Sequence, residues 1–378
     1  MRVDRNVELK WENMRRGIEA QVAWLGAGAA TLHDLAGARL GGDPPPRVYL
    51  VGCGDSHYCG LATRLAFERW SGVPTEALES LEFSRYVVDH APEGAWVVCV
   101  SNSGRVTRTV EAAIFARERG LVPVALTFDG ESRLAQNAAV TLPFGYEDVG
   151  FGPGTLSYMA SLSGLYAIAL HLATMTGRAD GAAAARRREV LAGQAQAVAA
   201  AIAGCDPIAA ELGRATGADA PVHIIGAGPN YGTALFGMAK LIEAAATPAV
   251  GQELEEWAHE QYFCTGPGTL TMVLAPPGAA LDRAREQLQA VRDVGGTAVA
   301  ICAEDDAETR ALADHVLPVP RSDAEELSPI TCCVPLQLFA YHHAVDKGRT
   351  MLGFDDRRRM EVNFRQIFGS QIPVERGG

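Results

Sequence analysis

The chain carries two copies of one sequence layout, and this repeat limits its fold more than any other feature. The segment VYLVGCGDSHYCGLATRLAFER, beginning at Val48, matches VHIIGAGPNYGTALFGMAKLIEA, beginning at Val222. In each copy an apolar stretch runs into a Gly-x-Gly loop and then into a helical pattern. A second matching pair follows at nearly the same separation, RERGLVPVALTFDGESRLAQNAAVTLPF and RDVGGTAVAICAEDDAETRALADHVLPVP. Two copies of one supersecondary unit are the simplest account.

Each copy alternates short apolar strands with helices. We expect strands near 47–52, 95–101, 121–127 and 139–143 in the first copy, and near 221–226, 270–275, 297–302 and 315–319 in the second. We expect helices near 58–71, 106–119 and 131–137, and near 231–246, 280–294 and 306–314. Continuous Val/Ile/Leu strands with intervening helices predict an α/β fold in which helices cover both faces of a parallel sheet.

Four segments follow from this pattern. A helical segment at 1–40, with its helix near 6–37, precedes a first domain at 41–200. That domain ends in an Ala-rich helical connector, Gly181–Gly204. The second domain covers 201–350, and a polar tail covers 351–378.

Composition excludes several classes of protein. Of 378 residues, 48% are apolar and 21% charged, which is typical of a soluble globular protein. The net charge of −12 disfavours a nucleic-acid partner. We expect no signal peptide and no membrane span, since neither an h-region nor a run of about 18 apolar residues is found. The eight cysteines form no CxxC pair, so we expect reduced thiols in a cytoplasmic protein and no zinc.

The stretch from Ser101 to Gly104 stands where an apolar strand ends and a helix begins. Ligands of parallel sheets bind beyond the carboxyl ends of strands. Free backbone N–H groups and the helix dipole favour an anion there, and Arg105 and Arg108 add positive charge. An ordinary serine-capped helix is the alternative. The two Gly-x-Gly loops lack the third glycine or the spacing of a dinucleotide site, so a nicotinamide cofactor is not expected.

In GMAKLIEAAA, Lys240 and Glu243 stand three residues apart and share one helix face. They are either a solvated ion pair or a catalytic pair. We interpret the acidic run at 253–256 as a solvated face, and His342 and His343 as structural, because no histidine completes a metal-ligand set.

Four motifs resemble a known family. They are GCGDSHYCGL, VSNSGRVTRTVEAA, GMAKLIEAAATPAVGQELEEWAHEQ and SPITCCVPLQLFAYHHAVDKG, and their order and spacing are similar to those of the two sugar isomerase (SIS) domains of the glucosamine-6-phosphate synthases. The resemblance covers Arg47 to Gly348. It implies two flavodoxin-like three-layer domains related by duplication. The family's glutaminase domain has no counterpart here, so release of ammonia from glutamine is not expected.

The resemblance also implies catalytic roles. Glu243 would move a proton between C1 and C2 of an open-chain sugar, and Lys240 would assist at the neighbouring hydroxyl. His259, sixteen residues after Glu243, would open the sugar ring in the site of a partner subunit, which implies a homodimer. Trp257 is a candidate wall of the sugar site. A partly desolvated carboxylate is a stronger base, and an imidazole titrates near neutrality, so both suit these tasks.

The substrate-binding residues implied by the resemblance lie in three loops. They are Gly54, Asp55, Ser56, Ser101, Asn102, Ser103, Arg105, Thr107, Gly154 and Thr155. The chain departs from the family at several of them. Asn102 replaces a glutamine, Arg105 an acidic residue, and Asp55 a threonine. The neighbouring Val106 replaces a threonine and Leu156 a lysine. The tail offers Glu361 where the family has an imine-forming lysine, so glutamine-dependent amination is not expected.

These residues predict a cytoplasmic aldose–ketose isomerase that acts on a sugar phosphate or another anionic sugar through an enediol. An amino-sugar phosphate deaminase or an Amadori-product deglycase would use the same base and stays open. A non-catalytic sugar-phosphate sensor is a further alternative. We expect no metal and no redox cofactor.

Overall fold

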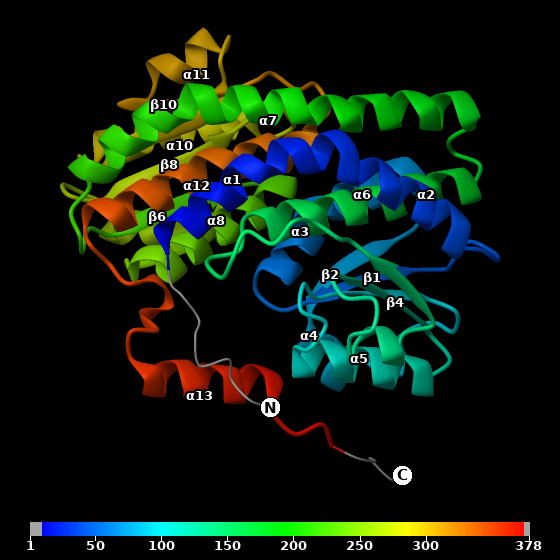
Figure 1. Ribbon diagram of the computed structural model, residues 1–378. Helices are drawn as coiled ribbons and strands as arrows, with labels where there is room; N and C mark the ends of the chain where they lie inside the picture. Colours follow the sequence, from blue (N-terminus) through cyan, green and yellow to red (C-terminus); the bar gives the residue numbers. More distant parts are fainter. Residues whose placement is uncertain (1–9, 374–378) are drawn as a thin grey trace.

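The computed structural model describes residues 10–373 and contains two parallel five-stranded sheets (Figure 1). The first has the order β2-β1-β3-β4-β5, with β1 Val48–Gly52, β2 Thr75–Glu79, β3 Trp96–Val100, β4 Val122–Thr127 and β5 Val140–Pro143. The second has the order β7-β6-β8-β9-β10, with β6 Val222–Gly226, β7 Ala249–Glu253, β8 Leu270–Ala275, β9 Thr297–Ala303 and β10 His315–Val319. Both follow the flavodoxin-like order 2-1-3-4-5, which confirms the predicted duplication.

The duplication extends to single backbone angles. Gly54 precedes the first helix of one copy with φ 54° and ψ −128°, and Gly228 does so in the other with φ 54° and ψ −126°. Glycine adopts this positive φ without steric cost. Both copies therefore make the same tight turn from strand to helix.

Helices cover both faces of each sheet. The principal ones are α1 Trp11–Ala23, α2 Ala29–Arg39, α3 Asp55–Ser71, α5 Thr107–Glu118, α6 Leu156–Met175, α7 Gly181–Ala215, α8 Pro229–Ala245, α10 Leu281–Asp293 and α12 Ser328–Asp346. Shorter ones are α4 Ser80–Glu82, α9 Glu256–His259 and α11 Ala307–Ala311.

Strand residues alternate between two kinds of core. Leu50 and Ile224 face a central core that the helices between the sheets share (Figure 1). Their neighbours Val51 and Ile225 face separate outer cores, under α5 and α10. The two domains are thus joined through one continuous apolar interior.

Several predicted elements differ from the structure. The helix expected near 131–137 is only a 3-10 turn, Ala135–Asn137, and the one near 306–314 shrinks to α11. The connector continues past Gly204 to Ala215. The amino-terminal helix is two α-helices joined by a π-helical turn, Trp24–Gly28, and its residues 6–9 lie outside the described residues.

Several elements were not predicted. Strands β2 and β7 have the sequences TEALE and AVGQE, which lack the apolar runs of the central strands. The polar tail contains α13, Arg357–Phe368, which lies apart from the other helices and contacts α5 (Figure 1). Helix α6 is long and apolar enough to span a membrane, yet 89% of its apolar window is buried inside the protein. Its length and apolarity are therefore accounted for by the central core.

Candidate functional site

The Ser101–Gly104 stretch forms a rigid turn between β3 and α5. Ser101 N–H donates to Leu126 O at 3.0 Å, and Phe128 N–H donates to Asn102 O at 3.0 Å. Gly104 has φ +57°, and a Cβ there would lie 2.1 Å from Ser132 Oγ, so only glycine fits. These hydrogen bonds tie the turn to β4 and to the residue that follows it.

Two hydroxyl groups of this turn are buried without a hydrogen-bond partner among the described residues. They are Ser101 Oγ and Thr107 Oγ1, and the two residues are 2% and 0% exposed. Buried polar atoms without partners are uncommon and costly in folded proteins. Unused donors at a helix amino terminus are the arrangement that an anion would complete.

A cavity of ≈ 530 Å³ opens beside the turn. Its lining consists of Asn102, Ser103, Arg105, Phe128, Asp129, Tyr146 and Asp148. Arg105 provides its positive charge, with the guanidinium carbon 5.2 Å from the ring centre of Phe368 in the tail. Arg108 is engaged elsewhere, in a close ion pair with the buried Glu111. Arg105 is therefore better placed than Arg108 to meet an anion.

A charged cluster, formed by Lys240, Asp55 and Glu243, joins the two copies. Lys240 Nζ donates to Asp55 Oδ2 at 2.7 Å and to Glu243 Oε2 at 2.5 Å. The Lys240 side chain is 0% exposed, whereas those of Asp55 and Glu243 are 23% and 32% exposed. The alternative of a solvated Lys240–Glu243 pair is therefore wrong, since the ammonium is fully buried.

Burial changes the acidity of this cluster. Desolvation raises the pKa of Asp55 to about 7, and Glu243 adds to the effect while Lys240 opposes it. The pKa of Lys240 is raised, because the two carboxylates outweigh the lowering by burial. The ammonium therefore stays charged at neutral pH.

A short chain of contacts links the charged cluster to the turn. A Cβ on Gly154 would lie 2.8 Å from Asp55 Oδ2 and 2.9 Å from Ser157 Oγ. Burial raises the pKa of Tyr146 to about 12, and hydrogen bonds with Asn102 and Ser157 act against that rise. Tyr146 OH donates to Asn102 Oδ1 at 2.8 Å. The turn and the charged cluster are thus neighbouring parts of one region.

Three further predicted binding residues lie at the starts of two helices, α3 and α6. Gly54 and Ser56 belong to the strand-to-helix turn that carries Asp55. Thr155 is buried at the start of α6, where its hydroxyl fills the space beside Gly17 of α1. The structure thus gives Thr155 a packing role next to the site.

The model of the SIS domain matches residues 44–171 and 220–346, the same two units that the strand order defines. The chain belongs to the SIS-domain family. A glutamine–fructose-6-phosphate aminotransferase (isomerizing) of Gloeobacter violaceus is 32% identical over 308 residues, covering 80% of this chain and 49% of that enzyme. The chain therefore spans about half the length of the curated relatives it matches.

Solved structures of SIS proteins have the same fold. The C-terminal domain of glucosamine-fructose-6-phosphate aminotransferase from Francisella tularensis superposes with a TM-score of 0.81 at 19% identity, covering 90% of this chain and 98% of that one. Tagatose-6-phosphate ketose/aldose isomerase from Escherichia coli superposes with a TM-score of 0.72 at 17% identity, covering 98% of this chain and 100% of that one. At these identities the likeness shows the fold.

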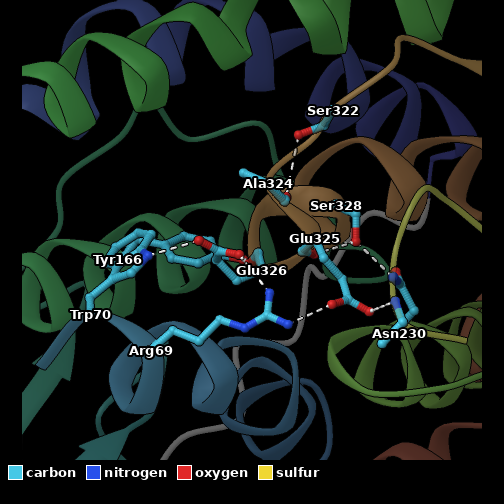
Figure 2. A network of polar contacts seen from close by, with 10 residues as sticks. Arg69, Trp70, Tyr166, Asn230, Ser322, Ala324, Glu325, Glu326 and Ser328 are labelled. Atoms are coloured by element: carbon cyan, nitrogen blue, oxygen red, sulfur yellow. Dashed lines mark hydrogen bonds and ion pairs between the residues drawn. The ribbon is translucent and has the colours of Figure 1, made fainter. Parts of the chain in front are cut away.

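The second SIS domain carries a loop equivalent to the Ser101–Gly104 turn, but this loop is closed. Its residues at 275–280 lack hydroxyl groups, and Ala279 N–H donates to Glu325 Oε1 at 3.0 Å. Arg69 of the first SIS domain donates to Glu325 Oε2 at 2.8 Å and to Glu326 Oε2 at 3.0 Å (Figure 2). A carboxylate of the chain occupies this loop, and only ≈ 20 Å³ remains beside it. The candidate anion site is therefore in the first SIS domain.

His259 lies apart from the charged cluster within one chain. Its side chain is 68% exposed, and its Nε2 lies 3.7 Å from Glu255 Oε1.

Trp257, a candidate wall of the sugar site, is fully buried in the outer core of the second SIS domain, so that expectation is wrong. The acidic run is held by Arg283 and backbone N–H groups. Among residues 10–373, no three His, Cys, Asp or Glu side chains form a candidate metal cluster.

Sequence reasoning missed two residues that connect the site. Tyr146 lies between β5 and α6 in a stretch with no strong periodic pattern, and Ser157 lies in the first turn of α6. Phe368 contacts Arg105 at the edge of the site, although the sequence predicts only a polar tail there. The available signal for Tyr146 was the group of aromatic residues that it forms with Phe144 and Phe151, after β5 and before the sequence Gly152-Pro153-Gly154.

Proposed function

We propose that this SIS protein transfers a proton between C1 and C2 of an anionic sugar, as an aldose–ketose isomerase does. Glu243 is the base, and its carboxylate is held beside the buried Lys240 ammonium. The Ser101, Asn102 and Ser103 turn binds the anion with help from Arg105. The observation that carries this proposal is that one segment approaches both parts of the site, since Tyr146 hydrogen-bonds Asn102 of the turn and the space beside Gly154 is bordered by Asp55 of the charged cluster.

The names of the relatives support this chemistry. One curated relative is an isomerizing aminotransferase of fructose 6-phosphate, and one structural neighbour is a ketose/aldose isomerase of tagatose 6-phosphate. Both names describe phosphorylated sugars whose carbonyl group changes position. A phosphate suits the two unpartnered hydroxyls and the helix amino terminus of the turn.

In the proposed mechanism each residue acts on a stated atom. Glu243 takes a proton from the carbon next to the carbonyl and returns it to the neighbouring carbon, so no atom is lost or gained. Lys240 donates two of its N–H bonds to carboxylates, which positions Glu243. Its positive charge would stabilise the negative charge that develops on the enediolate.

We propose that His259 acts in the site of a second copy of this chain. Within one chain it is exposed, and the nearby Phe263 is 78% exposed. An exposed aromatic residue beside a candidate catalytic residue favours a subunit interface there. The eight free cysteines support a cytoplasmic location, where thiols stay reduced.

The proposal is tested by proton NMR in heavy water with phosphorylated, aminated, glycated and sulfonated hexoses. The protein should catalyse the incorporation of solvent deuterium at C1 or C2 of at least one of these sugars. Glu243→Gln should abolish this exchange while leaving ligand affinity nearly unchanged. Glu286→Gln, at an exposed ion pair with Arg283, is the matched control and should exchange normally. Exchange that persists in Glu243→Gln would show that Glu243 is not the base. Binding without exchange would identify a sensor.

A further inference from the structure

A further cavity, of ≈ 350 Å³, lies where the two SIS domains meet the connector helix α7. Its lining comes from three places, namely Trp70 near the end of α3, four residues of α7 between 183 and 190, and three residues between 324 and 327, just before α12. A volume of this size is typical of small-molecule sites. The cavity therefore has room for a ligand that would contact both domains at once.

Two arginines of this cavity have no acidic partner. Neither Arg186 nor Arg187 forms an ion pair or a hydrogen bond with another residue in the part of the chain that the structure describes. The carboxylate of the lining, Glu326, is already held by Trp70 Nε1 at 2.9 Å and by Arg69 at 3.0 Å (Figure 2). The cavity thus keeps two uncompensated positive charges, in a chain whose net charge is −12.

Arg187 is held by packing and not by an opposite charge. Its guanidinium carbon lies 5.4 Å from the ring centre of the buried Trp70. Its Nη1 is buried and has no hydrogen-bond partner among the described residues. An ordinary solvated arginine would keep its N–H groups in water, whereas a buried N–H without an acceptor costs free energy. The arrangement therefore suits an acceptor that the chain itself does not supply.

The lining also indicates the chemistry of the ligand. Guanidinium groups bind phosphate through paired, charge-assisted hydrogen bonds. Apart from Glu326 and the two arginines, the lining is apolar and consists of Trp70, Ala183, Val190, Ala324 and Leu327. Val190 is 49% exposed, so its side chain is accessible from the cavity. A phosphate that carries a small apolar body would use both kinds of surface.

We propose that this cavity is a binding site for a small phosphate monoester, with the phosphate on Arg186 and Arg187 and the apolar body against Val190 and Leu327. The site is separate from the charged cluster, because α3 carries Asp55 at its start and Trp70 about 22 Å further along the helix. A ligand bound here does not touch Glu243. It acts as an effector that bridges the two domains, and not as a substrate.

Titration calorimetry with phenyl phosphate tests this site. The titrations use the full chain with Ser101→Ala and Thr107→Val, which remove two hydroxyls of the turn, so that binding at the turn does not mask the second site. Adding Arg186→Gln and Arg187→Gln should weaken binding about tenfold or more. Inorganic phosphate should bind about tenfold more weakly than phenyl phosphate, because it lacks the apolar body. Arg186→Gln alone, which should weaken binding about threefold, is the second variant if the double change does not fold.

Arg188→Gln is the matched control, because Arg188 is the next residue of α7, pairs with Asp34 at 3.3 Å and does not line the cavity. It should leave the affinity for phenyl phosphate unchanged. No binding of phenyl phosphate, or equal affinity with and without the changes at Arg186 and Arg187, would overturn the inference. Equal affinity for inorganic phosphate and phenyl phosphate would overturn the assignment of a monoester. The deuterium exchange assigned to Glu243 is measured separately, so these outcomes leave the proposed function intact.

Discussion

Lys240 Nζ lies 2.7 Å from Asp55 Oδ2, and this contact joins residues that stand 185 positions apart in the sequence. Asp55 begins α3 of the first SIS domain, and Lys240 lies in the equivalent helix, α8, of the second. Each copy brings part of the charged cluster, so the candidate site exists only when the two domains are docked.

Burial of Asp55, whose effect on its pKa the Lys240 contact only partly offsets, makes the stability of the protein depend on pH. The pKa of Asp55 is raised from 3.8 to about 7 on folding. Between these values the folded state keeps a proton that the unfolded state releases, so the free energy of unfolding falls as pH rises through this window. Asp55→Asn should lack this component and should gain roughly 2 kcal/mol relative to wild type between pH 5 and pH 7.5. Denaturant unfolding at both pH values measures it. Parallel pH profiles of the two proteins would contradict the raised pKa.

A side chain at Gly154 should displace Asp55. In Gly154→Ala the new Cβ would lie 2.8 Å from Asp55 Oδ2 and 2.9 Å from Ser157 Oγ, so Asp55 must move. We expect a fall of about 100-fold in the rate of solvent exchange, as for other small misplacements of reacting groups. Gly181→Ala, whose Cβ meets nothing within 4 Å, is the control and should exchange normally. Equal rates in both variants would show that the position of Asp55 does not matter.

The unpartnered hydroxyls of Ser101 and Thr107 give a test in which stability and binding respond differently. Ser101→Ala with Thr107→Val removes two buried polar atoms that have no partner among the described residues. Such a change should leave the melting temperature equal or higher. If the turn binds the anion, affinity for a sugar phosphate should fall about tenfold or more. Titration calorimetry and thermal unfolding measure the two quantities.

Thr109→Val is the matched control for that experiment. Thr109 lies on α5, the same helix as Thr107, but its hydroxyl has a partner, Oγ of Ser80 in α4 at 3.0 Å. It should lower the melting temperature and leave affinity unchanged. Unchanged affinity in the Ser101/Thr107 variant would assign the turn to helix capping alone.

The sequence predicted the central strands and the grouping of Lys240 with Glu243 because these depend on local periodicity. Continuous apolar runs such as that of β3 identify a strand buried on both faces, and a spacing of three residues identifies one helix face. The edge strands β2 and β7 were missed because TEALE and AVGQE carry little apolar signal. The place of Asp55 against Lys240 depends on how α3 packs on α8, which no local pattern contains.

The same limit applies to the closed loop of the second SIS domain. Loss of hydroxyl residues after β8 is visible in the sequence APPGAA. The carboxylate that fills the loop comes from Glu325, 46 residues further on, and is held by Arg69 of the other domain. Such a contact follows only from the docking of the two domains.

The proposed subunit arrangement predicts complementation between two inactive variants. Glu243→Gln lacks the base, and His259→Ala lacks the exposed imidazole that we assign to the partner's site. Each variant alone should show little exchange with a cyclic sugar phosphate. After mixed unfolding and refolding in equal amounts, half of the dimers should be mixed, and each mixed dimer contains one intact site. About a quarter of the wild-type rate should therefore return. Proton NMR measures the exchange rate of the two variants after they are refolded together and after they are refolded separately. If His259 acts within its own chain, every site in the mixture lacks one group, and no activity returns.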